Sequence, residues 1–362
     1  MRVGIDVTYA AKREGTGTYI RNLVNALACY PEIEIVTFAR PRPAFLRLLP
    51  RPLARLANGL FSISWLQIAV PIMARQQRLD IFHAPAFIAP LLLHCPMVLT
   101  IHDAVPFIHR QRNYRLWGLY MRLFVGIGTR RAARVIAVST HASNVLAQIF
   151  ALPGAKVRAI PLGVSPQFRI LSPDDTHTAI LPATAAPFLL FVGASDERKN
   201  YTALLTALDL LRARGENVPQ LLVTGKPTAE FCTLADAANV RTAGCINFLG
   251  FISEEALIAL YNRADAFVFP SRYEGFGLPI LEAMACGCPV ICSNTTSLPE
   301  VAGEAALMID PENPAALAEA IAMVCSDHEL RARLIAAGRE RARAFTWAHT
   351  AEQTLSTYRE VA

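Results

Sequence analysis

The chain is long, apolar and basic. It has 362 residues, of which 53% are hydrophobic and 18% charged, and its formal net charge is +6 at pH 7. This composition excludes a disordered chain, and the length predicts two domains because single cores rarely grow so large. Its eight cysteines form no CxxC pair, which favours buried free thiols in a reducing compartment over a zinc site.

Short apolar runs alternate with helical stretches along the whole chain, which is typical of parallel sheets wound with helices. The strands predicted in the first half are Val3–Val7, Ile33–Phe38, Ile81–His83, Met97–Ile101, Val135–Val138 and Val157–Ile160. After the first strand, Gly15 and Gly17 open a predicted helix, and glycine lets the backbone approach a phosphate there. Residue 20 is Ile, so the run lacks the dinucleotide-binding G-x-G-x-x-G, and taken alone it is also compatible with an ordinary turn.

The charge is distributed unevenly. Residues 1–170 carry 21 Lys and Arg against 6 Asp and Glu (+15), and the rest carry 14 against 23 (−9), which sums to +6. Basic residues gather in 40–55 and 110–134, among the apolar side chains Phe45, Leu46, Leu48, Leu49, Trp117, Tyr120 and Phe124. No nucleic-acid module is present. The pattern favours an anionic membrane surface or a lipid-linked diphosphate, with a solvated arginine surface as the alternative.

Two uncharged stretches are long enough to raise the question of a membrane span. Residues 81–102 hold no charged side chain but are interrupted by Pro85, Pro90 and Pro96. Residues 59–74 are short for a span and contain Pro71. We therefore predict no transmembrane segment, and since no signal peptide precedes the first strand, a cytoplasmic protein.

The polar stretch 172–178 predicts a linker between two similar halves. Beyond it, the predicted strands are Phe188–Val192, Leu221–Thr224, Ile246–Phe248, Ala266–Phe269, Val290–Cys292 and Ala306–Ile309, and residues 347–361 are predicted to be helical. The expected organisation is a first domain over 1–172, a second over 173–345 and a terminal helix over 346–362.

Two glutamates bracket a glycine-rich turn in the second half. Glu274-Gly275-Phe276-Gly277 leads through Leu278 and Pro279 into an apolar helix, and Pro279 suits a first helical turn. Because helical side chains lean toward the N-terminus, Glu282 can reach the pocket that Glu274 enters from the loop. The N–H groups of this helix start favour an anionic or hydroxyl-rich ligand. The alternative to a binding site is that Glu274 is an acidic residue of a surface loop and Glu282 a solvated residue of the helix.

This stretch resembles the donor-binding motif of retaining glycosyltransferases of family four, which have the GT-B fold. The similarity continues through 286–291, 298–303 and 309–311. It is greatest to bacterial members that build O-antigen or exopolysaccharide, many of which use GDP-mannose. The resemblance implies an α/β protein with two Rossmann-like, doubly wound domains facing a cleft, and a terminal helix that crosses back to the first domain.

The resemblance also implies roles for individual residues. Gly193, Arg198 and Lys199 match a diphosphate-binding segment, where fixed cations stabilise the charge that develops on the leaving diphosphate. Some members carry Arg where this chain has Ala194. No Asp-x-Asp pair is present, so a site without metal, and a protein without a cofactor, is expected.

Further roles follow from the same resemblance. Glu274 would hold the donor sugar together with the backbone of Gly275, Phe276, Gly277 and Leu278, while Glu282 would bind ribose hydroxyls. Gly15 and Gly17 match a first-domain glycine loop. His102 ends a predicted strand and would contact the transferred sugar. Ser139 matches a serine near the acceptor, whereas His83 and His94 are expected to be structural.

The sequence thus predicts a retaining, metal-independent hexosyltransferase that docks on the inner membrane face. It would move mannose from GDP-mannose to a glycan or a polyprenyl-diphosphate-linked acceptor in lipopolysaccharide or exopolysaccharide synthesis. Three alternatives remain open: a UDP-hexose-dependent transferase, a nucleotide-sugar epimerase on the same fold, and a non-catalytic subunit that binds a nucleotide sugar or a glycan.

Overall fold

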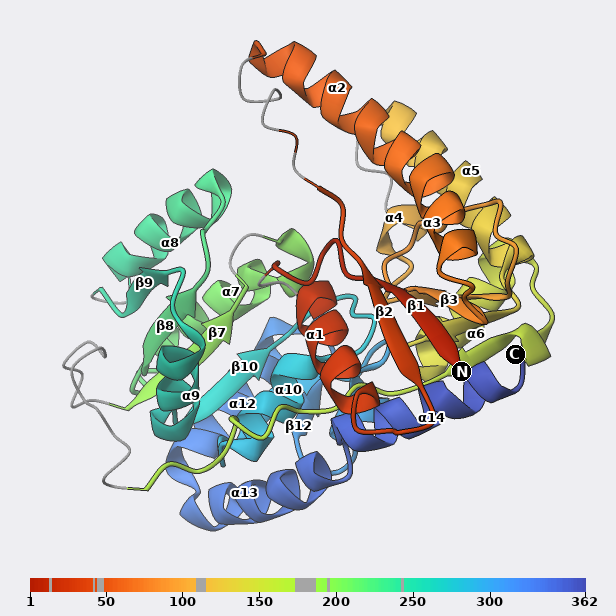
Figure 1. Cartoon of the computed structure of the whole chain (residues 1–362). Coiled ribbons are helices and arrows are strands. Elements are labelled where there is room, and N and C mark those ends of the chain that lie inside the picture. Colours follow the sequence, from red (N-terminus) through yellow and green to blue (C-terminus); the bar gives the residue numbers. More distant parts are fainter. Residues whose placement is uncertain are drawn as a thin grey trace. The chain divides into compact units, whose positions relative to one another are not determined.

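The computed structural model describes residues 1–12, 15–41, 43, 49–108, 115–172, 187–193, 196–241 and 244–362, without the side chains of 115–122 and 240–241. It contains two compact units, one made of Met1–Gly163 with Trp347–Ala362 and the other of Val164–Thr346. Figure 1 shows the elements of each unit along the chain.

The first unit is built on a six-stranded parallel sheet of order β2-β1-β3-β4-β5-β6. Its strands are β1 (Arg2–Asp6), β2 (Glu34–Phe38), β3 (Ile81–Ala84), β4 (Met97–Ile101), β5 (Arg134–Ala137) and β6 (Val157–Ala159). Its helices are α1 (Gly15–Leu27), α2 (Arg51–Ser64), α3 (Val70–Gln76), α4 (Val105–Ile108), α5 (Arg115–Arg131), α6 (Thr140–Phe150) and α14 (Trp347–Arg359). All six predicted strands are present within one or two residues at their ends.

The second unit repeats this plan with the order β12-β11-β10-β7-β8-β9. Its strands are β7 (Phe188–Val192), β8 (Gln220–Thr224), β9 (Ile246–Gly250), β10 (Ala266–Phe269), β11 (Val290–Ser293) and β12 (Leu307–Ile309). Its helices are α7 (Tyr201–Ala213), α8 (Ala229–Arg241), α9 (Glu254–Arg263), α10 (Leu278–Ala285), α11 (Leu298–Ala302), α12 (Pro314–Ser326) and α13 (His328–Arg343). The predicted α/β class is confirmed.

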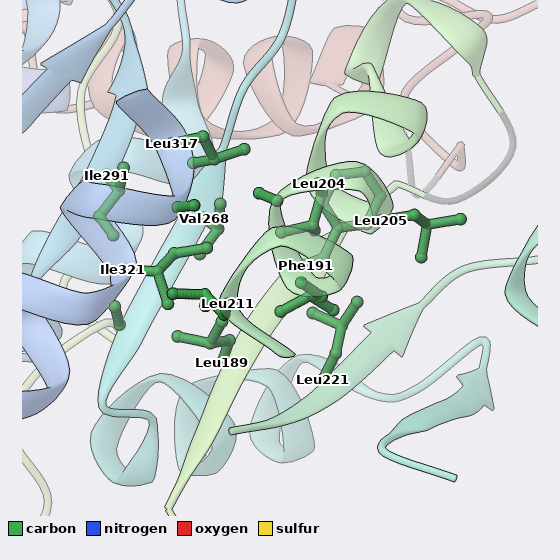
Figure 2. Packing of buried hydrophobic residues seen from close by; sticks show 14 of the residues in the cluster. Leu189, Phe191, Leu204, Leu205, Leu211, Leu221, Val268, Ile291, Leu317 and Ile321 are labelled. Atoms are coloured by element: carbon green, nitrogen blue, oxygen red, sulfur yellow. The ribbon is translucent and has the colours of Figure 1, made fainter. Parts of the chain in front are cut away.

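The core of the second unit explains why its strands read as continuous apolar runs. Leu189 and Phe191 of β7 pack under Leu204 and Leu211 of α7, and Ile321 of α12 joins the same cluster (Figure 2). No buried residue of α9 or α10 belongs to this cluster, and α10 packs instead against α9 and α13, so these helices cover the other face. Strands covered on both faces need no polar alternation.

Each sheet reverses its direction of growth at one point. In the first unit the reversal lies between β1 and β3, and in the second between β7 and β10. Loops leaving the carboxyl ends of strands at such a point diverge and leave a crevice, the usual ligand position in open α/β sheets. The glycine loop of 15–17 follows β1, and the segments of 193–199 and 271–277 follow β7 and β10.

The boundary between the units differs from the predicted one. The sequence placed it after residue 172, but the compact units divide at Gly163 and Val164. Residues 164–171 belong to the second unit because Val164 N donates to Phe345 O (3.0 Å) and Leu171 N donates to Asn262 Oδ1 (2.8 Å). Residues 173–178 of the predicted linker lie outside the described residues.

The terminal helix α14 belongs to the first unit, where it packs against α1. Tyr358 of α14 is fully buried, and its hydroxyl lies 2.6 Å from Nδ1 of His83 in β3. Thr350 donates to the carbonyl of Pro161 at 2.8 Å. The last helix of the chain is therefore part of the core built by the first 163 residues.

One helical run bears on the prediction that no segment spans a membrane. The uncharged residues 59–74 lie within a continuous helical stretch, Arg51–Gln76, that consists of α2, the π-turn η2 (Trp65–Ala69) and α3. Pro71 does not break this run, because it stands in the first turn of α3 directly after the π-turn. By length and composition alone this one stretch of the described chain could cross a membrane.

Candidate active site

The candidate site of the second unit is formed by the two loops at the reversal point of its sheet. The loop after β7 carries Gly193, Arg198 and Lys199, and the loop after β10 carries Glu274. The amide of Arg272 donates to the carbonyl of Arg198 at 2.8 Å, which ties the two loops together. Segments about seventy-five residues apart in sequence thus meet at one edge of the sheet.

Lys199 and Glu274 form the central ion pair of this site. Lys199 Nζ lies 2.8 Å from Glu274 Oε1, and the two side chains are 16% and 14% exposed. The ammonium also lies 4.3 Å from the ring centroid of Phe269, a cation–π contact that fixes its position. A positive and a negative group are thereby held at one place and shielded from water on most sides.

Arg198 is also paired with a carboxylate. Its Nε donates to both carboxylate oxygens of Asp196, at 3.1 and 2.9 Å. Burial alone would raise the pKa of Asp196, but the hydrogen bonds and charge of Arg198 outweigh it and hold that pKa below its ordinary value. Asn200, at φ +60°, follows this turn and donates to the carbonyl of Pro311 at 2.7 Å. Ala194, which the resemblance compares with an Arg, lies outside the described residues.

Gly193 has a conformation and surroundings that favour glycine. Its φ is +98°, and an added Cβ would lie 3.2 Å from Cε of Lys199. A side chain at this position would be strained and would press on the lysine that pairs with Glu274.

The loop of Glu274 is held by hydroxyl groups of the segment after β11. The Ser297 hydroxyl lies 3.0 Å from the carbonyl of Glu274 and 2.8 Å from that of Phe276. The amide of Glu274 donates to Thr296 Oγ1 at 3.3 Å. Gly277, the residue before α10, has φ +114°, and an added Cβ there would lie 2.8 Å from Leu298 Cδ2. Only glycine fits that turn, and its lack of a side chain leaves the helix start without a side-chain cap.

Glu282 lies one turn into α10, as predicted, and is partly buried. Burial raises the pKa of its carboxyl to about 8, the charge of Glu254 adds to this, and Lys199 acts in the opposite direction. Among the described residues, none forms a hydrogen bond with the side-chain carboxyl group of Glu282. It is therefore an acceptor that the fold itself does not use.

Two hydroxyl groups near these loops escaped prediction. Ser271 follows β10 and Thr295 follows β11, and within the described chain the side-chain oxygens of both are buried without a hydrogen-bond partner. Buried polar groups are usually paired, so unpaired ones at the carboxyl edge of a sheet indicate a polar ligand position. Serine and threonine at strand ends are too common for the sequence to single them out.

In the first unit, the two glycines that were expected to approach a ligand have different surroundings. An added Cβ on Gly17 would lie 2.0 Å from the carbonyl oxygen of Lys12 and 3.0 Å from that of Tyr9. Gly17 is therefore required by the chain's own turn before α1. Gly15 meets nothing within 4 Å and stands at the helix start, so of the two it is the one with space for a ligand.

His102 follows β4 and is held in a defined orientation. Its Nε2 lies 2.9 Å from the carbonyl of Pro85, and its ring packs edge-on against Tyr19 with centroids 4.8 Å apart. Burial lowers the pKa of His102 to about 4, so the imidazole is neutral near pH 7. Because a carbonyl can only accept, Nε2 carries the proton and Nδ1 keeps a lone pair.

Three other predicted groups have structural surroundings. His83 is fully buried between Tyr358 and Thr100, and burial lowers its pKa to about 3. Ser139, expected near the acceptor, is fully buried, and its oxygen caps α6 by accepting from Ala142 N at 3.0 Å. The eight cysteines are free thiols, as predicted, but only Cys245, Cys286, Cys288 and Cys292 are buried, and Cys29 is exposed. Among the described residues no cluster of three or more His, Cys, Asp or Glu could hold a metal ion.

Two six-stranded parallel sheets wound with helices, each in its own compact unit, define an α/β protein of two Rossmann-like units, the fold class called GT-B. Comparison with known proteins supplies the family. Residues 13–168 match the model for "Glycosyltransferase Family 4", and residues 174–341 match "Glycosyl transferases group 1". The chain belongs to this glycosyltransferase family.

Relatives and solved structures agree with this assignment. The O-antigen chain mannosyltransferase B of Escherichia coli is 33% identical over 282 residues, which covers 77% of this chain and 74% of that protein. A serotype-specific mannosyltransferase WbdA of E. coli is 30% identical over 72% of this chain but only 32% of its own length. Sucrose-phosphate synthase from Thermosynechococcus elongatus has a TM-score of 0.74 at 22% identity, covering 99% and 98% of the chains. Anabaena HepE in complex with UDP-glucose gives 0.74 at 18% identity, covering 99% and 100%.

Proposed function

We propose that this glycosyltransferase moves a mannosyl residue from GDP-mannose to a growing glycan or a polyprenyl-diphosphate-linked acceptor, with retention of anomeric configuration. It would act without metal on the cytoplasmic face of a membrane, in the synthesis of a surface polysaccharide. The observation that carries the proposal is the Lys199–Glu274 pair beside the glycine turn at the start of α10.

The proposed chemistry follows from where the charges stand. The donor diphosphate lies against Lys199 and Arg198, which stabilise the charge that grows as the glycosidic bond breaks. Glu274 and the backbone from Gly275 to Leu278 hold the sugar hydroxyls, and Glu282 accepts from the ribose. The acceptor hydroxyl attacks from the face that the diphosphate leaves, and the leaving phosphate takes its proton.

In this proposal the neutral state of His102 matters. A transferring sugar develops positive charge at its anomeric carbon, and a cationic imidazole would oppose that charge. His102 is uncharged near pH 7 because burial lowers its pKa to about 4, and its Nδ1 lone pair is free to accept from a sugar hydroxyl. Its contact with the transferred sugar is part of the proposal.

The mannose donor is supported by the relatives. Both E. coli relatives are named as mannosyltransferases, one of them of an O-antigen chain. The solved HepE complexes hold UDP and UDP-glucose, but at less than 20% identity they support the fold and not the donor. A UDP-hexose-dependent transferase is therefore the second candidate.

Calorimetry with GDP, UDP, GDP-mannose and UDP-glucose tests the donor. We expect GDP and GDP-mannose to bind and the uridine nucleotides to bind at least about tenfold more weakly, a difference of about 1.4 kcal/mol. Tight UDP binding with no GDP binding would overturn the mannose proposal while leaving the family assignment intact. The anomeric configuration of the isolated product, read from its one-bond C–H coupling, tests retention.

The remaining alternatives are separated by omitting the acceptor. An epimerase converts its nucleotide sugar without an acceptor, so a new epimer after incubation with donor alone would replace the transferase proposal. A non-catalytic subunit would bind the donor but show neither transfer nor slow hydrolysis. We expect slow hydrolysis of the donor alone and fast consumption only with a glycan acceptor present.

A further inference from the structure

The helical run Arg51–Gln76 of the first unit turns a row of large apolar side chains to solvent. Six of them, between 37% and 63% exposed, are Leu53, Leu56, Leu60, Ile63, Ile68 and Ile72. Single exposed leucines are ordinary on soluble proteins, but a contiguous apolar row marks an interaction surface. Only 6% of the most apolar window of this run is buried.

The π-turn η2 is what keeps the six side chains in one row. Successive members are three, four, three, five and four residues apart. An α-helix puts residues three and four apart on the same face, so the step of five from Ile63 to Ile68 would rotate Ile68 away. That step crosses η2, where the amide of Val70 donates to the carbonyl of Trp65, five residues back. The wider turn absorbs the extra residue and returns Ile68 and Ile72 to the face of Leu60.

The rest of the helix is attached to the first unit. Val70 and Ala74 are fully buried. The Gln67 side chain donates to Ala89 O at 3.0 Å and accepts from Leu91 N at 2.9 Å. Arg40 donates to Asn58 Oδ1 at 2.8 Å. A helix that crossed a bilayer would have to give up these contacts, whereas a helix lying on a surface keeps them. In Figure 1, α2 extends away from the β1–β3 region of its own unit.

The charges around the apolar row have one sign. Residues 35–79 contain seven arginines and no Asp or Glu. Arg51 and Arg55 are exposed at the start of the helix, and Arg75 and Arg78 at its end. An apolar row flanked by arginines matches the boundary layer of an anionic bilayer, where guanidinium groups meet head-group phosphates and leucines enter the acyl layer.

We propose that the Arg51–Gln76 helix is a membrane-surface anchor, lying in the plane of an anionic bilayer with its six exposed leucines and isoleucines in the acyl boundary. The proposal deepens and rests on one part of the proposed function, the action at a membrane face, and its test needs neither donor nor acceptor. Failure of the anchor would withdraw the membrane face and leave the transfer reaction standing, whereas failure of the transfer reaction would leave vesicle binding unchanged.

The test is sedimentation with vesicles of equal parts phosphatidylglycerol and phosphatidylcholine, and with phosphatidylcholine alone. We expect the wild type to sediment with the anionic vesicles at low salt and much less at high salt or without anionic lipid. Leu56→Glu and Leu60→Glu should each lower the partition coefficient by about tenfold or more, because a leucine contributes about that much in an apolar layer. Both side chains are over half exposed, so the fold should survive, which circular dichroism checks.

Met323→Glu is the matched control, because Met323 is an exposed apolar residue of α12 in the other unit. It should bind vesicles like the wild type. Three results would overturn the proposal. The first is that the wild type does not sediment with the vesicles, and the second is that a double variant with both Leu56→Glu and Leu60→Glu sediments as the wild type does. The third is that the bound protein resists extraction by alkaline carbonate, which indicates a spanning helix. A dimer in ultracentrifugation that the double variant dissociates, without vesicle binding, would assign the face to a second copy instead.

Discussion

Replacing Lys199 by alanine should reduce turnover far more than replacing Glu282. The ammonium of Lys199 is held 2.8 Å from Glu274 and 4.3 Å from the Phe269 ring centroid, so it is preorganised before the donor binds. In the proposed mechanism it stabilises charge that is greatest in the transition state, whereas ribose contacts of Glu282 are equal before and during reaction. Loss of such a preorganised electrostatic contact costs on the order of 100-fold in rate.

The same substitution also affects stability, and this must be separated from catalysis. It leaves Glu274 partly buried without its partner. Removing one member of a fully buried pair costs about 3–5 kcal/mol, and we expect roughly 1–3 kcal/mol here because both side chains keep some exposure. For a unit of this size each kcal/mol lowers Tm by about 2–4 °C. Rates should therefore be measured well below the melting temperature of the variant.

The assay is initial transfer rate over a range of donor concentrations, so that kcat and KM are obtained separately for Lys199→Ala, Glu282→Ala and a control. Arg272→Ala is the control, since Arg272 pairs with Glu312 at 2.6 Å on the same edge of the sheet but both partners are exposed. Exposed ion pairs contribute little to stability, so the kcat and KM of this variant should resemble those of the wild type. If Lys199→Ala raised KM and left kcat unchanged, the lysine would only bind the donor and its assigned role would be refuted.

Two further predictions concern metal and pH. EDTA should leave transfer unchanged, because Arg198 and Lys199 supply the positive charge that a metal supplies elsewhere; loss of activity restored by Mn²⁺ or Mg²⁺ would contradict this. Burial raises the pKa of Glu282 to about 8 in the folded state. Between the unfolded pKa and about pH 8, the folded protein therefore retains a proton that the unfolded chain has lost. Because of this difference, the free energy of unfolding falls as pH rises through that window. Glu282→Gln should therefore melt at a higher temperature than the wild type at about pH 9 and lose most of this advantage at about pH 5; a pH-independent difference between the two would count against the assignment.

The sheets were predictable because their strands are buried on both faces. A run such as Phe188–Val192 has no polar residue to interrupt it, and all twelve predicted strands are present. The unit boundary was not predictable in the same way. Residues 164–171 join the second unit through hydrogen bonds to Phe345 and Asn262, which are distant in sequence. Local pattern carries no information about such partners.

The helix Arg51–Gln76 shows a second limit. Pro71 was part of the argument against a membrane span at residues 59–74, since proline removes a backbone donor. The π-turn before it changes the hydrogen-bonding register, and the proline falls at the start of α3, where it is tolerated. A π-turn has no sequence pattern of its own, so both the length of the helix and the alignment of its apolar row became apparent only in the structure.

The residues of the candidate site were named from sequence, but their pairing was not. Arg198 and Lys199 were expected to be fixed cations for a diphosphate, and the structure pairs each of them with a carboxylate, Asp196 and Glu274 respectively. The four charges sum to zero. In the proposed mechanism the diphosphate meets cations that are already oriented and paired, and its binding must compete with the two carboxylates.

The backbone conformation of the loop around Glu274 supports the proposal that these paired charges form a ligand site. Thr296 has φ +58°, an uncommon conformation for a β-branched residue, with a typical cost of about 1–3 kcal/mol. Its hydroxyl oxygen accepts from the amide of Glu274, and the hydroxyl of Ser297 donates to the carbonyls of Glu274 and Phe276. The adjacent Thr295 hydroxyl is buried without a partner in the described chain. A strained residue and an unpaired hydroxyl both reduce stability, and together with the shielded ion pair they lie around one carboxylate. Since folding alone does not require the strained residue or the unpaired hydroxyl, their presence supports the proposal that Glu274 orients a ligand.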